Sequence, residues 1–204
     1  MKKSWLVLIL ILAAAGVKAQ RFDAGVLAGF NASQVNGDTY QGYYKPGLLG
    51  GLFVRTDLAP AVFAGMELKY SQKGARNKIT PKDPDPKKYI MRLGYADIPV
   101  FVGFRTSNTV SVIGGISAGY LVHGAEYNEY GKFPPQDQVK FKAFDVQAFA
   151  GFQYDLLDQV ILDLRIAYSV LPIRGQPGET YWYWLDNQFN NVISLALCYR
   201  FRRD

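Results

Sequence analysis

The chain has 204 residues, of which 49% are hydrophobic and 20% charged, and it contains a single Cys and a single His. This length allows one domain or at most two small ones, and the apolar fraction excludes a disordered chain. One Cys excludes a disulfide scaffold, and one Cys with one His leaves no usual ligand set for zinc. The formal charge of +6 would suit a nucleic-acid partner if the whole chain kept its lysines.

The N-terminal segment has the organisation of a secretory signal peptide. Two lysines open it, an apolar run fills residues 5–15, and short side chains precede a cleavage site before Gln20. A membrane anchor would need about 20 apolar residues, and this run is shorter. We therefore expect residues 1–19 to be removed and residues 20–204 to form the mature domain. Removal takes three lysines, which lowers the formal charge from +6 to +3, so we expect no nucleic-acid partner.

The rest of the chain alternates apolar and polar residues with period two, which is the pattern of β-strands. In the clearest segment, Leu162, Leu164 and Ile166 share one face, and Asp163 and Arg165 share the other. Eight such strands are predicted, at about 22–33, 47–57, 61–73, 91–105, 110–122, 142–155, 160–171 and 191–201.

The connections between the predicted strands alternate in length. Long polar segments rich in Pro and Gly follow every odd-numbered strand, at 34–46, 74–90, 123–141 and 172–190. Short turns, such as 58–60 and 106–109, follow the even-numbered ones. Long loops at one end and short turns at the other, with an even strand count, are typical of an outer-membrane barrel. We therefore predict an all-β fold, an eight-stranded antiparallel up-and-down transmembrane β-barrel.

The direction of the apolar face separates a membrane barrel from a soluble, secreted ligand-binding barrel, which would turn that face inward. Most strand glycines share the polar face, as the narrow interior of an eight-stranded barrel requires. These glycines are Gly25, Gly29, Gly47, Gly51, Gly65, Gly103, Gly115, Gly119 and Gly151. Aromatic residues on the apolar face gather at the two ends of the strands, as membrane girdles do. They are Phe30, Tyr70, Tyr120, Phe144 and Tyr168 at one end, and Phe22, Phe104, Phe152, Tyr154, Tyr199 and Phe201 at the other. Both features favour the membrane, with the soluble barrel as the alternative.

Charged residues of both signs fall on the polar face, so barrel closure would bring them together inside. The candidate interior network consists of Arg55, Glu67, Lys69, Asp97, Asp145, Asp163 and Arg165. Buried charges must pair or be hydrated. We interpret this set as a salt-bridged filling that closes the lumen. A selective pore or proton path, in a small-solute or lipid transporter, is the alternative.

Candidate catalytic groups are few. His123 is the only imidazole, and Ser117 and Glu126 are its nearest partners in sequence for hydrolase chemistry at the barrel rim. A solvated loop histidine explains His123 more simply, and Cys198 fits a small interior residue. We predict a non-enzymatic protein with no cofactor and no metal.

One loop segment is the best candidate for recognition. Tyr181, Trp182, Tyr183 and Trp184 follow one another in the last long connection. Tyr and Trp bring large amphipathic surfaces to an interface at low entropic cost. Alternatively, the same rings rest at the membrane interface as part of an aromatic belt.

Four motifs occur in order along the mature chain: AGVLAGFN at 24–31, KPG at 45–47, ELKYSQKG at 67–74 and LGYADIPV at 93–100. Together they resemble the PorT-like outer-membrane β-barrel family of Bacteroidota, although Asp97 replaces the usual Glu and Ala96 is smaller than usual. The resemblance implies an eight-stranded barrel in the outer membrane, in contact with its lipid. The founding member takes part in type IX protein secretion, which implies an envelope or secretion-system protein as a possible partner. The resemblance defines no catalytic or ligand residues.

Overall fold

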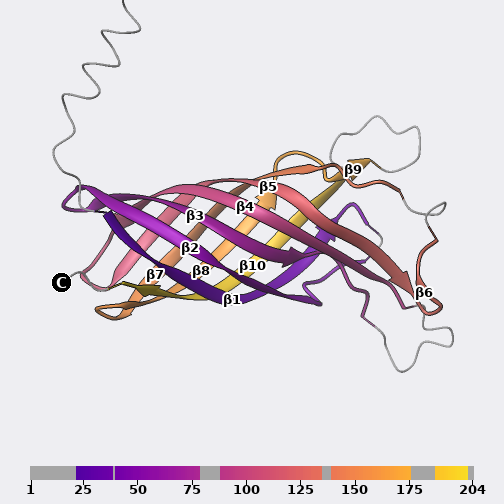
Figure 1. Ribbon diagram of the computed structural model, residues 1–204, viewed down its shortest axis with the longest axis horizontal. Helices are drawn as coiled ribbons and strands as arrows, with labels where there is room; N and C mark the ends of the chain where they lie inside the picture. The colour runs from indigo at the N-terminus through magenta and orange to yellow at the C-terminus, as the bar shows by residue number, and fades with distance from the viewer. Residues whose placement is uncertain (1–21, 39, 79–87, 135–138, 176–186, 202–204) are drawn as a thin grey trace, which may run out of the picture.

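The computed structural model describes residues 22–38, 40–78, 88–134, 139–175 and 187–201, which form eight long antiparallel strands closed into a barrel (Figure 1). The predicted fold is confirmed. The long strands are β1 (Phe22–Asn36), β2 (Lys45–Ala59), β3 (Val62–Lys73), β4 (Ile90–Arg105), β5 (Val110–Asn128), β7 (Phe144–Leu157), β8 (Val160–Ser169) and β10 (Asn187–Arg200). Two short strands, β6 (Gly131–Lys132) and β9 (Arg174–Gly175), pair with β5 and β10. In the described part of the chain, no helix has the length and hydropathy to cross a membrane.

Pairing between the first and last long strands closes the barrel. Each long strand pairs with the next one along the chain, and β1 also pairs with β10. The seam runs from the Gly25–Arg200 pair to the Asn36–Phe189 pair without a register shift. Around the part of the barrel where all eight described long strands pair, closure leaves no strand edge, so the strand backbones satisfy their hydrogen bonds within the wall.

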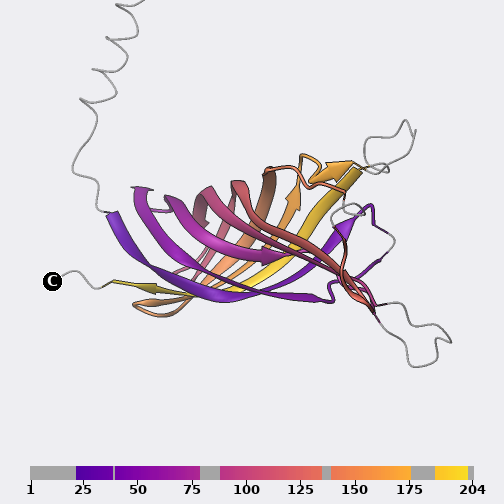
Figure 2. The ribbon, with the colours of Figure 1, turned by 45° about the vertical axis from the view of Figure 1, so that its right-hand side comes forward.

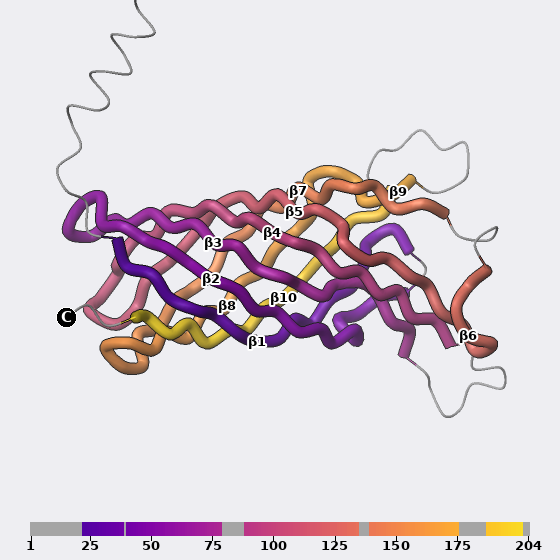
Figure 3. The backbone as a smooth tube through the Cα atoms, viewed as in Figure 1, coloured from indigo at the N-terminus to yellow at the C-terminus, as the bar shows by residue number. Residues whose placement is uncertain are grey.

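The two ends of the barrel differ as the loop lengths predicted. Short turns join β2 to β3, β4 to β5 and β7 to β8 at one end, where β1 begins and β10 ends (Figures 1 and 3). The long connections lie at the other end, where β4 and β5 run on beyond their neighbours (Figure 2). In bacterial outer-membrane barrels the short turns face the periplasm and the long loops face the exterior.

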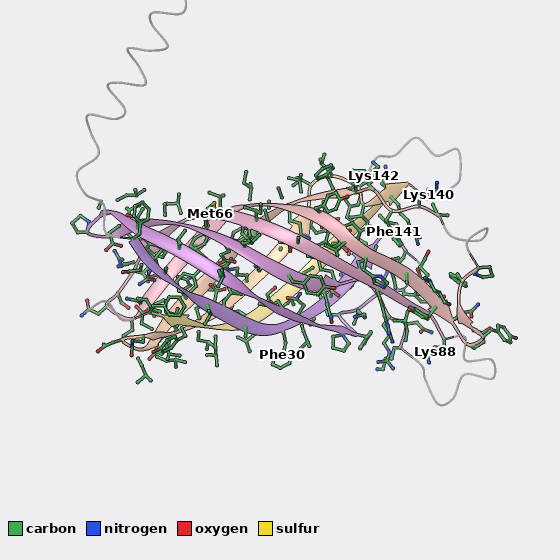
Figure 4. The ribbon with its side chains drawn as sticks, in the orientation of Figure 1. Phe30, Met66, Lys88, Lys140, Phe141 and Lys142 are labelled. Carbon is green, nitrogen blue, oxygen red and sulfur yellow. The ribbon has the colours of Figure 1, made fainter. Side chains whose placement is uncertain are left out.

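Away from the β-bulges, side chains alternate between the lumen and the outer surface. Outward residues form an apolar belt, in which Phe30 is 65% exposed and Met66 is 48% exposed (Figure 4). Inward, the buried rings of Phe63 and Phe101 lie against Gly103 and Gly65. A lumen this narrow accepts a large ring only where the facing position carries no side chain.

The structure corrects the predicted end of the fifth strand. That strand was expected to stop at residue 122, but β5 continues to Asn128. Gly94 pairs with His123 whereas Tyr95 pairs with Leu121, so Val122 is an extra residue, a β-bulge. A bulge reverses which residues face inward beyond it. The period-two sequence pattern is therefore interrupted at residue 122, where the predicted strand ended.

Two adjacent glycines of β5 give a matched test of the narrow interior. A Cβ on the inward Gly115 would collide with the Val100 carbonyl oxygen, whereas one on the outward Gly114 would meet nothing closer than 3.8 Å. Gly115→Ala is expected to lower the free energy of unfolding by about 1–3 kcal/mol. Gly114→Ala should change it by less than about 1 kcal/mol. Urea titration of the folded, unboiled gel band measures both, and equal stability of the two variants would contradict the assigned faces.

Candidate functional site

A cluster of charges crosses the lumen between β3 and β8. Arg165 on β8 donates from Nε to Asp163 Oδ1 at 2.7 Å and from a terminal nitrogen to Glu67 on β3. Lys69 Nζ lies 3.2 Å from Glu67, and Gln153 donates to Asp163 at 2.6 Å. We call these five residues the Arg165 cluster.

Two aromatic rings enclose the centre of the Arg165 cluster. The guanidinium carbon of Arg165 lies 5.0 Å from the ring centroid of Phe101 and 5.1 Å from that of Phe149. Arg165 is only 6% exposed. Ring faces attract the cation, and the carboxylates balance its charge in a site with little water.

A second cluster surrounds Lys73, nearer the long-loop end. Lys73 Nζ lies 3.0 Å from Asp97 and 3.5 Å from Asp145, and it donates to Gln147 at 2.9 Å. Asp145 also accepts hydrogen bonds from the two buried residues Ser169, at 2.7 Å, and Asn190, at 2.9 Å. One cation therefore holds two carboxylates that β4 and β7 place in the lumen.

Of the seven residues of the predicted network, the described contacts bring Glu67, Lys69, Asp163 and Arg165 together in one cluster, and the other three lie elsewhere along the lumen. Arg55 pairs with Asp23 at 3.7 Å near the short turns, apart from the other six. Those six are divided between the Arg165 cluster and the Lys73 cluster. Strand phase places a side chain on the inner face but does not give its height along the lumen, and height decides which charges meet.

A third cluster closes the long-loop end and was missed by the sequence reasoning. Arg174 forms a two-pronged ion pair with Glu126, at 2.7 and 2.9 Å, and donates to Gln188 at 2.6 Å. Tyr89 donates to the same carboxylate. Burial, together with the charge of Glu126, raises the pKa of Tyr89 well above its usual value, so this hydroxyl keeps its proton. An apolar layer lies beside this cluster and includes Val35, Ala75, Met91, Leu93, Tyr95 and Ile173.

Little free space remains between these clusters. A cavity of about 20 Å³ lies between the Lys73 and Arg165 clusters, and one of about 10 Å³ lies beside the Arg165 cluster near Cys198. A water molecule needs about 10–15 Å³ of such volume, so each cavity has room for about one.

The residues considered for hydrolase chemistry do not converge. Ser117 and Glu126 are buried in the lumen, at 5% and 4% exposure, whereas His123 lies on the outer wall because the bulge turns it outward. Among the described residues, no group of three His, Cys, Asp or Glu side chains could hold a metal ion. The aromatic segment at residues 181–184 lies outside the described residues.

Comparison with known proteins identifies the family. Residues 16–174 match the family described as outer membrane protein beta-barrel domain. The chain belongs to this family. It is thus an integral outer-membrane protein, and its apolar belt contacts membrane lipid. No curated protein sequence matches the chain.

Solved structures of the protein Ail share the fold of this outer-membrane barrel. Ail, the attachment invasion locus protein of Yersinia pestis, is 18% identical, with a TM-score of 0.54 over 88% of this chain and 98% of Ail. Ail in complex with the heparin analogue sucrose octasulfate is 17% identical, with a TM-score of 0.53 over 89% and 99%. The Neisserial surface protein A is 11% identical, with a TM-score of 0.48 over 90% and 100%.

Removing the cation of the Arg165 cluster should be costly. Arg165→Met leaves the buried carboxylates of Glu67 and Asp163 without their main partner, and we expect a loss of about 3–5 kcal/mol in unfolding free energy. The control is Arg105→Met at the short turns, where the Arg105–Asp57 pair is open to solvent and worth about 0–1 kcal/mol. Urea midpoints in detergent compare the two. Equal midpoints would mean that the Arg165 cluster contributes nothing to stability.

Proposed function

We propose that this outer-membrane barrel does not conduct, and that it acts through its outer surfaces as an envelope-structural or partner-binding protein. The observation that carries the proposal is the filled lumen, in which the Arg165 cluster, the Lys73 cluster and the Glu126–Arg174 pair follow one another along the barrel. Eight strands leave an interior that side chains can fill. The sites open to a partner are therefore the long loops and the outer wall.

The alternative is a transporter of small solutes or lipids. Such a protein needs a wider lumen or an opening between strands in the wall. The unbroken register of the β1–β10 seam and the small lumen cavities favour the closed barrel.

A narrower assignment rests on the sequence motifs. The resemblance to PorT-like barrels of Bacteroidota makes an accessory role in protein secretion our proposal for the process served. We further propose that residues 1–19 are a cleaved signal peptide, that residues 20–204 are the mature barrel, and that the protein has no enzymatic activity. The separation of His123 from Ser117 and Glu126 supports the last point.

The filled lumen predicts that the barrel does not conduct ions. Mature protein inserted in planar lipid bilayers should give no steady current, because three polar clusters and an apolar layer block the path for ions. A porin inserted under the same conditions provides the positive control. Stable ohmic steps from the unmodified protein would contradict the proposal and favour the transporter.

The aromatic loop segment gives the test of partner binding. Replacing Trp182 and Trp184 together by Ala should reduce cross-linking to envelope proteins in intact cells, because two large amphipathic surfaces are removed. The heating temperature at which the folded gel band disappears should stay unchanged. A lower temperature with unchanged cross-linking would instead place these rings in the membrane belt.

A further inference from the structure

A groove opens in the outer wall at the long-loop end, over neighbouring residues of β2, β3, β4 and β5. The regular pairing of β2 with β3 ends at Leu49 and Ser71, and just beyond it the Leu48 N–H donates to the side-chain oxygen of Gln72 at 3.3 Å. The groove has a volume of about 410 Å³. Its lining combines four basic side chains with polar and apolar ones: Lys45, Arg76, Arg92 and His123 with Pro46, Tyr70, Gln72, Ile90, Leu93 and Gly94.

One lining residue of the groove, Lys45, is a buried cation with which no carboxylate of the described residues forms an ion pair. Lys45 is only 8% exposed, and its Nζ donates to the Pro46 carbonyl at 2.7 Å. The positive charges of Arg92 and Arg76 repel the positive charge of Lys45. Among the described residues, no carboxylate forms an ion pair with any of these three cations. In the lumen clusters of the described residues, Lys73, Arg165 and Arg174 each pair with a carboxylate, so this basic set differs from them and suits an anionic ligand.

Two features of β4 and β5 keep the groove open and basic. The bulge at Val122 turns His123 to the outer face, next to Gly94. A Cβ on Gly94 would collide with the Tyr70 hydroxyl, so glycine allows the Tyr70 ring to lie across β4 at the edge of the groove. Any larger residue at position 94 would displace that ring.

The position of the groove indicates a ligand that is both anionic and apolar. Below it, the outer wall is lined by lipid-facing side chains such as Leu52, Leu68 and Ile98, which are 47–57% exposed. Tyr70 marks the upper edge of this apolar belt, at the level where aromatic residues meet lipid headgroups. A lipid whose acyl chains rest on the belt would bring its headgroup to the four basic side chains.

We propose that this groove binds the phosphorylated headgroup of a lipid in the outer leaflet. Arg76 and Arg92 contact the phosphate from the exposed side, Lys45 lies at the buried side, and Tyr70 packs beside the lipid. This site goes beyond the proposed function, because it would hold whether the long loops bind a protein partner or not.

Native mass spectrometry of the mature protein in neutral detergent tests the site. The probes are lipid A with its phosphates, the same lipid after removal of the phosphates, and inorganic phosphate. The protein should retain phosphorylated lipid A, and the dephosphorylated lipid should be retained about tenfold less, as expected when charge-assisted contacts are lost. Millimolar inorganic phosphate should leave the retained lipid unchanged.

Matched variants locate the binding on the groove. Arg76→Gln/Arg92→Gln changes two exposed side chains, so the barrel should fold, and retention should fall about tenfold. Lys140→Gln/Lys142→Gln removes the same charge from exposed rim positions outside the groove (Figure 4) and should retain lipid as the unmodified protein does. Lys45→Gln should weaken retention as well, provided that its unboiled gel band shows a folded barrel.

Three results would overturn the proposal. Equal losses in the groove and rim variants would mean that overall charge, rather than the groove, attracts the lipid. Equal retention of the dephosphorylated lipid would remove the phosphate from the interaction. Displacement of lipid A by inorganic phosphate would assign the groove to a free anion.

Discussion

Closure of the sheet by the β1–β10 seam is the constraint on which the other features of this barrel depend. In lipid an unpaired strand edge would leave backbone donors and acceptors without partners, each at a cost of several kcal/mol. Closing with only eight strands satisfies them but fixes a narrow lumen. Every inward position therefore competes for the same space. This competition explains why Gly65 and Gly103 lie beside the rings of Phe101 and Phe63.

The narrow lumen also explains the arrangement of its charges. A buried carboxylate or guanidinium without a partner would be strongly destabilising. The barrel meets this requirement in layers, each with a central cation: Arg165 between two carboxylates, Lys73 between two more, and Arg174 on the carboxylate of Glu126. In each layer the cation reaches a carboxylate on a strand that does not pair with its own, as Arg165 on β8 reaches Glu67 on β3, so each layer also joins distant parts of the wall. The filling therefore stabilises the closed barrel as well as blocking the lumen.

The eight strands and their faces could be predicted from the sequence, because a wall that faces lipid on one side only must alternate apolar and polar residues. The two unlike ends could be predicted from the alternating loop lengths. Lys73 could have been found too, since it continues the inward phase of Glu67 and Lys69. Glu126 and Arg174 could not, because one lies beyond a bulge and the other in a long connection. The groove escaped prediction for a related reason. It depends on which side chains β2, β3, β4 and β5 bring together on the outer wall, and a pattern within single strands does not contain that information.

The bulge at Val122 connects the inner and outer sites of the long-loop end. With regular alternation, His123 would point into the lumen and Glu126 would point to the outside. The extra residue reverses both, so Glu126 reaches Arg174 inside and His123 joins the basic groove outside. Compared with regular alternation, the bulge takes the Glu126 carboxylate away from the outer face that carries Arg92 and places the His123 imidazole on that face. A single inserted residue thus closes the lumen with an ion pair and leaves the outer wall basic, which is the charge distribution that a barrel bound to phosphorylated lipid requires.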